Sequence, residues 1–334
     1  MLSKLAITLN PSEFYRAARH EAAVLRQPWN RGLIRLSGPE RISWLQGMVT
    51  NDVEKLHPGQ GVYAAHLNAQ GKLVAHMTIL ADSEAVWLVT EASNVKKLGE
   101  VLDRMIVMED VQCEDRSENF EPISVVGPKS GSILEALLGE PLNLGAEYDH
   151  REHPKCGRIV RDELGYTVWA DKSNMEPVLD GIIAAGAISI DESTWNILRT
   201  EAGIPIYGMD IDETTTLPEL GEKGIRYDKG CYIGQEVVAR IKYIGHVNRR
   251  FMGFVCDGEV IPASGSIVRS GGKDAGYVTS AIVSPTLGKA IALGFVNRLA
   301  AVTGTPVELV LGESKLTASV SELPFIPSAT WSLG

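Results

Sequence analysis

The sequence predicts an α+β protein in which a duplicated α+β region is followed by a small all-β domain. Helical and strand-like patterns alternate up to about residue 245, two stretches of this region echo two others in the same order, and only short strands follow. The chain of 334 residues is longer than one hydrophobic core usually organises, so at least two domains are expected.

The chain begins with the pattern of a helix, a strand and a second helix. Asn10 is a suitable N-cap for the first helix, and Glu13 completes a capping box. A strand is expected over Gly32–Leu36. Ser37 and Glu40 then form a second capping box, with a proline in the first turn of the helix that follows.

Two further strands and a third helix complete this first part. The runs Leu73–Leu80 and Val86–Thr90 are apolar enough for buried strands. Val95, Leu98 and Leu102 then recur at helical spacing on one face. This order of elements predicts an α+β unit.

Two pairs of segments indicate that this unit is repeated. Leu36–Pro39 resembles Val125–Pro128, and each ends a strand and opens a helix. Val86–Asn94 resembles Gly165–Asn174, and each is followed by a helical pattern. Chance similarity is the alternative, but two echoes in the same order favour duplication. A duplicated unit leaves a natural ligand site where its halves meet.

No helical period appears after Gly245, and short strands separated by turn residues indicate a small barrel or sandwich. We therefore expect a region over residues 1–245, built of two intertwined subdomains, and a β domain over residues 246–334. The expected strands are Phe251–Val255, Ser266–Arg269, Tyr277–Ile282, Ala290–Phe295, Val307–Leu311 and Leu316–Val320.

The most distinctive motif is the octapeptide Lys-Gly-Cys-Tyr-Ile-Gly-Gln-Glu at residues 229–236. It places Cys231 two residues from Lys229, and side chains two residues apart point the same way in an extended segment. A neighbouring cation favours the thiolate, the reactive form of cysteine. Cys231 is therefore a candidate catalytic residue, and Lys229 a candidate activator. The alternative is a tight turn with a small buried thiol.

Residues 223–250 carry seven basic and two acidic side chains, a net charge of +5 in a chain whose net charge is −10. A basic patch on an acidic body is expected to meet an anionic partner, either a small molecule rich in carboxylates or a nucleic-acid backbone. The alternative is a solvated surface strand. The overall acidity disfavours broad nucleic-acid binding, which needs many basic contacts.

The composition indicates an ordinary globular protein of the cytoplasm. No run of 18 apolar residues is present, so no membrane span is expected, and the N-terminus lacks a convincing signal peptide. The four cysteines are far apart and form no C-x-x-C pair. We therefore expect reduced thiols and no structural metal site.

Taken together, these features resemble the folate-binding superfamily of the glycine cleavage T protein, an aminomethyltransferase. The octapeptide resembles the signature of the YgfZ branch of this superfamily. Similar stretches cover most of the chain and include residues 45–52, 63–71, 198–208 and 292–296. The resemblance implies a duplicated α+β folate-binding region around a central opening, followed by a C-terminal β-barrel. It also implies tetrahydrofolate, or a one-carbon-substituted derivative, as the ligand.

The resemblance implies a set of folate-binding residues. Glu201 matches the glutamate that hydrogen-bonds the pterin ring, because a carboxylate accepts two parallel N–H donors. Arg199 and Arg240 are candidates for the carboxylates of the folate tail. Each has a structural alternative, such as a helix-surface carboxylate or a surface ion pair. The complete set of candidates is Tyr63, Arg199, Glu201, Tyr232, Gln235 and Arg240.

One departure from the family pattern bears on catalysis. The T protein uses an aspartate for proton transfer near the folate nitrogen, and the matching position here is Ala75. A positioned acid–base group contributes on the order of 10²–10⁴ in rate, which alanine cannot supply. His76 points to the opposite face of the strand, so it is not expected to substitute. Classical T-protein activity is therefore disfavoured, and enzymatic turnover is left open.

Three functions remain. The first is a YgfZ-type tetrahydrofolate-binding accessory protein that supports iron–sulfur cluster assembly or repair and iron–sulfur-dependent tRNA modification, with iron–sulfur proteins as partners. Cys231 alone cannot hold a stable cluster, which usually needs four cysteines. The second is a folate-dependent aminomethyltransferase. The third is an RNA-binding module, disfavoured because the sequence lacks an aromatic-rich basic surface.

Overall fold

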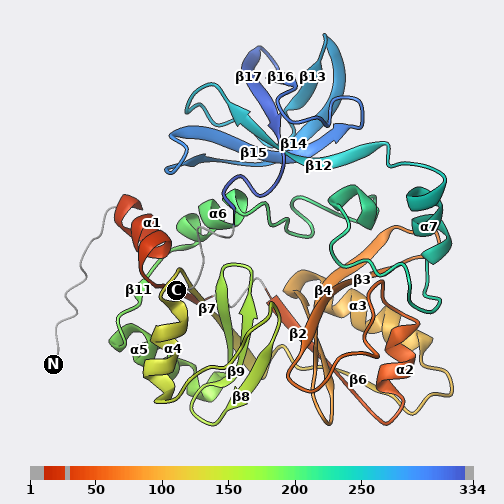
Figure 1. Cartoon of the computed structure of the whole chain (residues 1–334), viewed down its shortest axis with the longest axis vertical. Helices are drawn as coiled ribbons and strands as arrows, with labels where there is room; N and C mark the ends of the chain where they lie inside the picture. The colour runs from red at the N-terminus through yellow and green to blue at the C-terminus, as the bar shows by residue number, and fades with distance from the viewer. Residues whose placement is uncertain (1–10, 27–30, 328–334) are drawn as a thin grey trace.

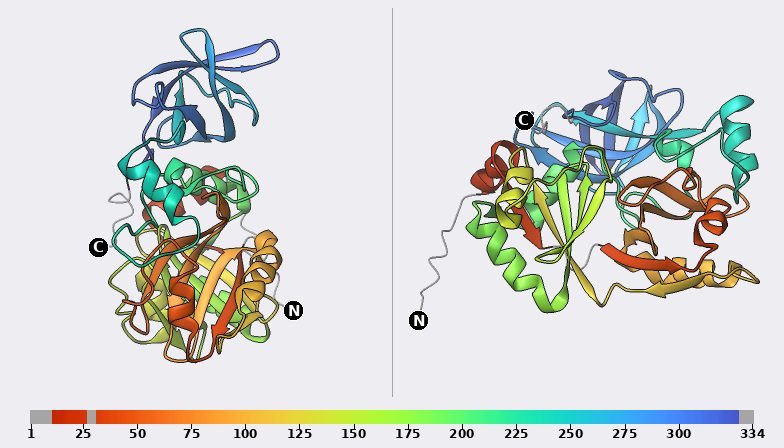
Figure 2. Two further views of the ribbon diagram at one scale, coloured as in Figure 1. Left: turned by 90° about the vertical axis from the view of Figure 1, so that its right-hand side faces the viewer. Right: turned by 60° about the horizontal axis from the view of Figure 1, so that its bottom comes forward.

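The structure is a computed structural model that describes residues 11–26 and 31–327. Two sheets with their helices and a closed barrel surround a central opening (Figure 1). Figure 2 shows the barrel from two further sides, set above the two sheets. This architecture confirms the predicted fold class. Asn10 lies outside the described residues. No helix within the described ranges is long and apolar enough to span a membrane.

The first sheet has the strand order β3-β4-β5-β2-β6, and all its neighbouring strands are antiparallel. Its core lies between one face of the sheet and the helices α2 and α3, with Ile34, Leu45, Ile79 and Leu98 fully buried. The elements are β2 (Arg31–Ser37), α2 (Arg41–Gln46), β3 (Gly61–Leu67), β4 (Leu73–Ala81), β5 (Val86–Glu91), α3 (Ala92–Met105) and β6 (Gln112–Asp115).

The second sheet has the order β11-β1-β7-β10-β9-β8 and packs against α4 and α5. Its strand β1 comes from the N-terminus, so the two halves of the region are intertwined. The elements are α1 (Pro11–His20), β1 (Ala23–Arg26), β7 (Phe120–Val126), α4 (Ser130–Leu138), β8 (His150–His153), β9 (Gly157–Asp162), β10 (Gly165–Asp171), η1 (Lys172–Asn174), α5 (Met175–Ala184) and β11 (Ile188–Ser189).

The structure confirms the duplication. The order β3-β4-β5-β2-β6 corresponds strand for strand to β8-β9-β10-β7-β1. The two strand-to-helix turns also match, because Gly38 has φ +102° and Gly127 has φ +101°. Both glycines adopt the left-handed backbone conformation that other residues rarely take. The short Gly-Pro echo in the sequence therefore marks two equivalent turns.

The second capping box is wrong in detail. Helix α2 begins at Arg41, Glu40 is its N-cap residue, and no side chain caps it. Ser37 is instead the last residue of β2, because the turn at Gly38 separates it from the helix. The Glu40 carboxylate accepts a hydrogen bond from the backbone N–H of Asp110.

All six strands expected in the β domain are present and close into a barrel with the order β12-β15-β14-β13-β16-β17. Helix α7 (Gln235–Tyr243) precedes the first strand. The exact boundary at residues 245/246 stays a prediction. The strands are β12 (Arg249–Cys256), β13 (Ile267–Ser270), β14 (Lys273–Ser284), β15 (Lys289–Asn297), β16 (Pro306–Leu311) and β17 (Ser314–Ser321).

Helix α6 (Glu192–Glu201) joins the barrel to the rest of the molecule, and the 3-10 helix η2 (Leu217–Leu220) lies farther along the same connection. Arg199 and Asp210 form an ion pair of 2.8 Å, and both side chains are fully buried. Asp210 also accepts hydrogen bonds from Thr279 and Ser280 of β14. A bulge between residues 278 and 280 shifts the register of this strand, which lets two consecutive side chains reach one carboxylate.

Replacing Arg199 with alanine is expected to cost about 3–5 kcal/mol of unfolding free energy, because Asp210 would remain as a buried charge without its partner. The measurement is urea unfolding followed by circular dichroism. Arg240→Ala is the matched control: Arg240 is exposed on α7, and its loss should cost less than about 0.5 kcal/mol. Equal stability of the two variants would show that the buried pair does not hold the fold.

Candidate functional site

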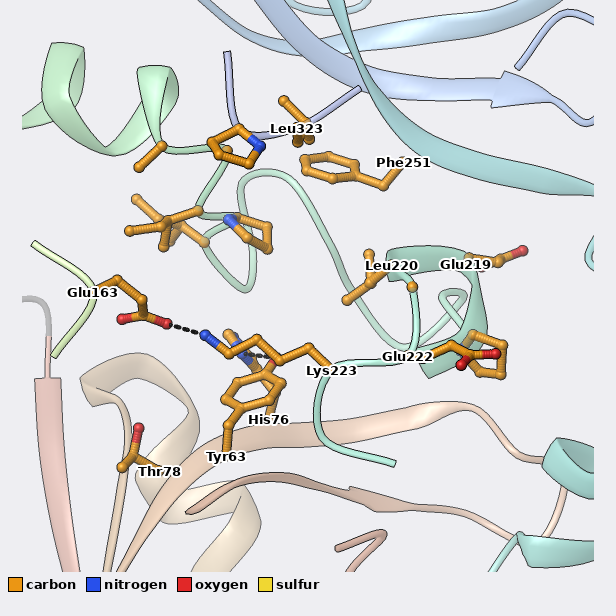
Figure 3. Close-up of a pocket in the computed structure, with 18 of the residues that line it drawn as sticks. Tyr63, His76, Thr78, Glu163, Glu219, Leu220, Glu222, Lys223, Phe251 and Leu323 are labelled. Atoms are coloured by element: carbon orange, nitrogen blue, oxygen red, sulfur yellow. Dashed lines mark hydrogen bonds and ion pairs between the residues drawn. The ribbon is translucent and has the colours of Figure 1, made fainter. Parts of the chain in front are cut away.

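A large cavity, with a volume of about 1370 Å³, lies where the two sheets, the barrel and the connecting segments meet. Figure 3 shows part of its wall, where side chains from distant parts of the chain approach one another. The first sheet supplies one wall, the turn between β9 and β10 another, and the start of the barrel a third. Its polar side chains include Tyr63, His76, Glu91, Glu163, Lys223 and Arg250.

Strand β4 directs His76, and not Ala75, toward the cavity. Ala75 is fully buried in the core of the first sheet with Ile79 and does not line the cavity, whereas His76 and Thr78 do. The assignment of the acid–base position to Ala75 is therefore corrected, because a carboxylate there would lie among apolar side chains. Since alternate residues of a strand share a face, position 76 and not position 75 faces the cavity.

Tyr63, His76 and Glu91 form a hydrogen-bonded array on this wall. The Tyr63 hydroxyl oxygen lies 2.8 Å from Nδ1 of His76, and Nε2 lies 2.8 Å from Oε1 of Glu91. Burial opposes the ionisation of Glu91, but the adjacent His76 outweighs it and lowers the pKa of the carboxyl to about 2. Burial raises the pKa of the Tyr63 phenol. An ionised carboxylate, the histidine ring and a protonated phenol therefore lie in series.

Lys223 connects the linking segment to the second sheet beside this array. Its Nζ lies 2.8 Å from carboxylate oxygens of Glu147 and Glu163, and Figure 3 shows its contact with Glu163 above the ring of Tyr63. Burial acts to raise the pKa of Glu163, but Lys223 outweighs it and lowers this pKa to about 2. The ammonium group also lies 5.7 Å from the centre of the Tyr63 ring. Lys223 therefore fixes both a carboxylate and an aromatic face at the cavity.

Two guanidinium groups at the barrel side of the cavity have no ion-pair partner in the part of the chain that the structure describes. Arg250 lies on β12 opposite Val296 of β15, and Arg298 directly follows β15. Both arginines are exposed and line the cavity. Because guanidinium pairs with carboxylates through two parallel hydrogen bonds, this end of the cavity can bind an anionic group.

The structure places the other two candidate arginines and Glu201 outside the cavity wall. Arg199 forms a buried ion pair with Asp210, and Arg240 is exposed on α7. Glu201 is fully buried, and its carboxylate accepts hydrogen bonds from Tyr15 and Ser284 and pairs with Arg19. The predicted direct role of Glu201 in ligand binding is therefore corrected: its carboxylate joins α1, α6 and the barrel.

Lys229 has a different task from the one expected. Its ammonium group donates hydrogen bonds to the carbonyl oxygens of Gln46, Val49 and Asn51, at 2.7, 2.6 and 2.9 Å. An ammonium group has three N–H donors, so all three are used. No hydrogen bond between Lys229 and Cys231 is present in the structure. Lys229 therefore fastens the octapeptide to the segment after α2, and its role as activator of Cys231 is corrected.

The remaining octapeptide residues also anchor the segment. Tyr232 is buried in the core beside the barrel, and Gln235 accepts a hydrogen bond from the backbone N–H of Tyr232 at 3.3 Å. Gly234 has φ +82°, and a Cβ there would lie 2.7 Å from the carbonyl oxygen of Asn68. Only glycine fits this close approach to the β3–β4 turn. Neither Tyr232 nor Gln235 lines the cavity.

Cys231 is the one exposed cysteine of the four. Burial raises the pKa of the Cys113, Cys156 and Cys256 thiols to about 11, so these three stay protonated near neutral pH. Cys231 does not line the cavity. Within the described residues, no group of three or more His, Cys, Asp or Glu side chains is arranged to hold a metal ion.

The basic stretch of residues 223–250 is largely neutralised in the structure, so the expected basic patch is corrected. Four of its seven cations form ion pairs, and Lys229 is bonded to carbonyl oxygens. Only Arg240 and Arg250 lack such partners among the described residues. The paired cations are Lys223 with Glu147 and Glu163, Arg226 with Asp228, Lys242 with Glu222, and Arg249 with Glu219.

The fold and the cavity define a ligand-binding protein in which a duplicated α+β region and a barrel enclose one site. Sequence comparison identifies the family: the GCVT N-terminal domain matches residues 15–225, and the glycine cleavage T-protein C-terminal barrel domain matches residues 249–326. The chain belongs to this family of glycine cleavage T-protein-like proteins.

Known relatives agree with this assignment. The chain is 31% identical to an aminomethyltransferase of Nostoc sp., over 89% of this chain and 83% of the relative. It is 29% identical to an aminomethyltransferase of Halothermothrix orenii, over 94% and 91%. The crystal structure of the glycine cleavage system aminomethyltransferase T from Bartonella henselae has a TM-score of 0.87 at 20% identity, covering 96% of this chain and 90% of that one. This last similarity supports the fold.

Sequence reasoning missed most of the cavity wall. It selected Tyr63 but not Glu91, Arg250 or Arg298, and it set His76 aside. Glu91 could have been found from the sequence, because a carboxylate at the end of an apolar strand is expected to be buried and then requires a hydrogen-bonding partner. Nothing in the sequence distinguishes Arg250 from the adjacent Arg249, which is paired with Glu219.

The stability that Glu91 contributes is expected to depend on pH. Its pKa is about 2 in the folded protein against an ordinary value of 4.5, so the unfolded chain takes up the proton first as the pH falls. The contribution, on the order of 3 kcal/mol, is complete above pH 4.5 and is lost as the pH approaches 2. Urea unfolding at several pH values should therefore show the wild-type chain and Glu91→Gln converging below pH 4.5. A difference that stays constant with pH would contradict the assignment.

Proposed function

We propose that the central cavity binds tetrahydrofolate, or a one-carbon derivative of it, and that the chain handles a one-carbon unit there as an aminomethyltransferase does. Membership of the glycine cleavage T-protein family and two relatives named aminomethyltransferase support this proposal. The cavity of about 1370 Å³ is ample for a ligand of this size.

The observation that carries the proposal is the distribution of chemistry along the cavity wall. The end near the first sheet offers the aromatic ring of Tyr63 and the carboxylate of Glu163, which suit a flat heterocycle rich in N–H groups. The barrel end offers the guanidinium groups of Arg250 and Arg298, which suit the carboxylates of a glutamate tail. A folate carries both kinds of group in one molecule.

Arg250→Gln combined with Arg298→Gln is expected to weaken tetrahydrofolate binding at least tenfold, because the carboxylates of the glutamate tail would lose their charge-assisted hydrogen bonds to the two guanidinium groups. Anaerobic calorimetric titration measures the affinity. A reduced pterin without the glutamate tail should bind the double variant and the wild-type chain equally well.

Arg240→Gln is the control for this experiment, since Arg240 is exposed but lies outside the cavity wall. It should leave the affinity for tetrahydrofolate unchanged. Equal affinity of the wild-type chain and the double variant would remove the two arginines from the site. Failure of the wild-type chain to bind tetrahydrofolate at millimolar concentration would overturn the proposed function itself.

A second candidate is the YgfZ-type accessory role in iron–sulfur cluster assembly or repair, carried out in the cytoplasm with iron–sulfur proteins as partners. The octapeptide favours it, because Lys229, Tyr232 and Gly234 all fix the segment while Cys231 is left exposed. A rigid, exposed thiol outside the cavity suits contact with another macromolecule. Turnover with an aminomethylated lipoyl carrier protein and tetrahydrofolate separates the two candidates.

Under the second candidate, Cys231→Ser is expected to abolish in-cell support of iron–sulfur enzymes without changing stability or folate affinity, because Cys231 is exposed and lies outside the cavity wall. The measurement is the activity of an iron–sulfur enzyme in a strain that lacks its own copy of the protein. Cys113→Ser is the control, since this part-buried thiol should be dispensable for function. Full complementation by Cys231→Ser would eliminate the cysteine mechanism.

A further inference from the structure

In the hydrogen-bonded array of Tyr63, His76 and Glu91, the carboxylate and the imidazole ring are each fixed by further contacts. Glu91 is held from several sides: Oε1 accepts from Nε2 of His76 at 2.8 Å and from the backbone N–H of Tyr207 at 3.4 Å, and Oε2 accepts from the Thr90 hydroxyl at 3.4 Å. The ring of Tyr207 stacks on the imidazole, with the ring centres 6.4 Å apart. The carboxylate and the imidazole ring are therefore both fixed in orientation.

These contacts determine the direction in which a proton can move. Because the ionised Glu91 only accepts hydrogen bonds, Nε2 of His76 donates to it, and Nδ1 is the acceptor in the tautomer that carries its proton on Nε2. The Tyr63 hydroxyl therefore donates to Nδ1, at 2.8 Å. The phenolic oxygen keeps a free lone pair on a residue that lines the cavity, while His76 and Glu91 are only 9% and 7% exposed.

We propose that Tyr63, His76 and Glu91 form a proton relay that acts as a general base on a ligand bound in the cavity. The proposal rests on the proposed function, since the ligand is a reduced folate whose nitrogen bonds to a one-carbon unit. Tyr63 touches the ligand and is the catalytic residue. His76 and Glu91 act through Tyr63 and are positioning residues.

The proton transfer is balanced. When the ligand nitrogen forms a bond to carbon, its N–H bond breaks, the electron pair stays on nitrogen, and the proton forms a new O–H bond on Tyr63. The original Tyr63 proton passes to Nδ1 of His76, and the resulting imidazolium lies against the Glu91 carboxylate. This is the same division of roles as in a nucleophile–histidine–carboxylate triad, with a phenol as the group that meets the substrate.

The test is the condensation of one equivalent of tetrahydrofolate with formaldehyde in the presence of excess protein, which gives the methylene derivative and water. Tyr63→Phe should slow this single turnover on the order of 10²-fold, the usual contribution of a positioned acid–base group. His76→Gln and Glu91→Gln should slow it comparably. Affinity for tetrahydrofolate, measured by calorimetry, should stay within about threefold in all three variants, because Tyr63→Phe keeps the aromatic ring and the two glutamine substitutions keep a polar side chain of similar size at largely buried positions.

Tyr207→Phe is the matched control. It removes the same hydroxyl from a ring that touches His76, but this hydroxyl points to Glu213 and Lys97 and lies outside the relay. Its condensation rate should equal that of the wild-type chain. Normal tetrahydrofolate binding with an unchanged rate in Tyr63→Phe would overturn the relay alone. Absence of tetrahydrofolate binding by the wild-type chain would overturn the proposed function and the relay together.

Discussion

The cavity depends on the buried charges that fix helix α6 to the barrel. Arg199 and Asp210 pair at 2.8 Å with no exposed surface, and Asp210 also binds two hydroxyl groups of β14. At the end of the same helix, the buried Glu201 accepts hydrogen bonds from α1 and from the barrel. Charges removed from water in this way are tolerated only when every partner is present. The two sheets and the barrel that enclose the cavity are therefore held in one arrangement. Arg199 and Glu201 are used in these contacts and are unavailable to a ligand.

Local patterns in the sequence were sufficient for the elements and the repeat. The six barrel strands follow from short apolar runs and their turns, and the paired turns at Gly38 and Gly127 follow from the echoed Gly-Pro segments. The direction of His76 was not predictable, because β4 is largely buried on both faces and its apolar run does not show which face meets the core. The three hydrogen bonds from Lys229 to backbone carbonyl oxygens could not be predicted from the sequence either, since these acceptors lie about 180 residues earlier in the chain.

The two functional candidates use different parts of one molecule. The cavity has the aromatic, carboxylate and guanidinium groups that a folate requires, and the family relationship favours a one-carbon function there. The octapeptide lies outside the cavity and presents Cys231 on a segment whose other side chains are anchored. A folate-binding cavity and an exposed thiol are compatible in one protein, so the cavity account does not depend on the role of Cys231.

The most direct measurement is a crystal structure of the protein soaked with tetrahydrofolate under anaerobic conditions. The account predicts density for the ligand in the central cavity, with the reduced pterin beside Tyr63 and the glutamate carboxylates against Arg250 and Arg298. An empty cavity at saturating ligand, or density in which the glutamate tail reaches Arg240 on the outer face of α7, would contradict it.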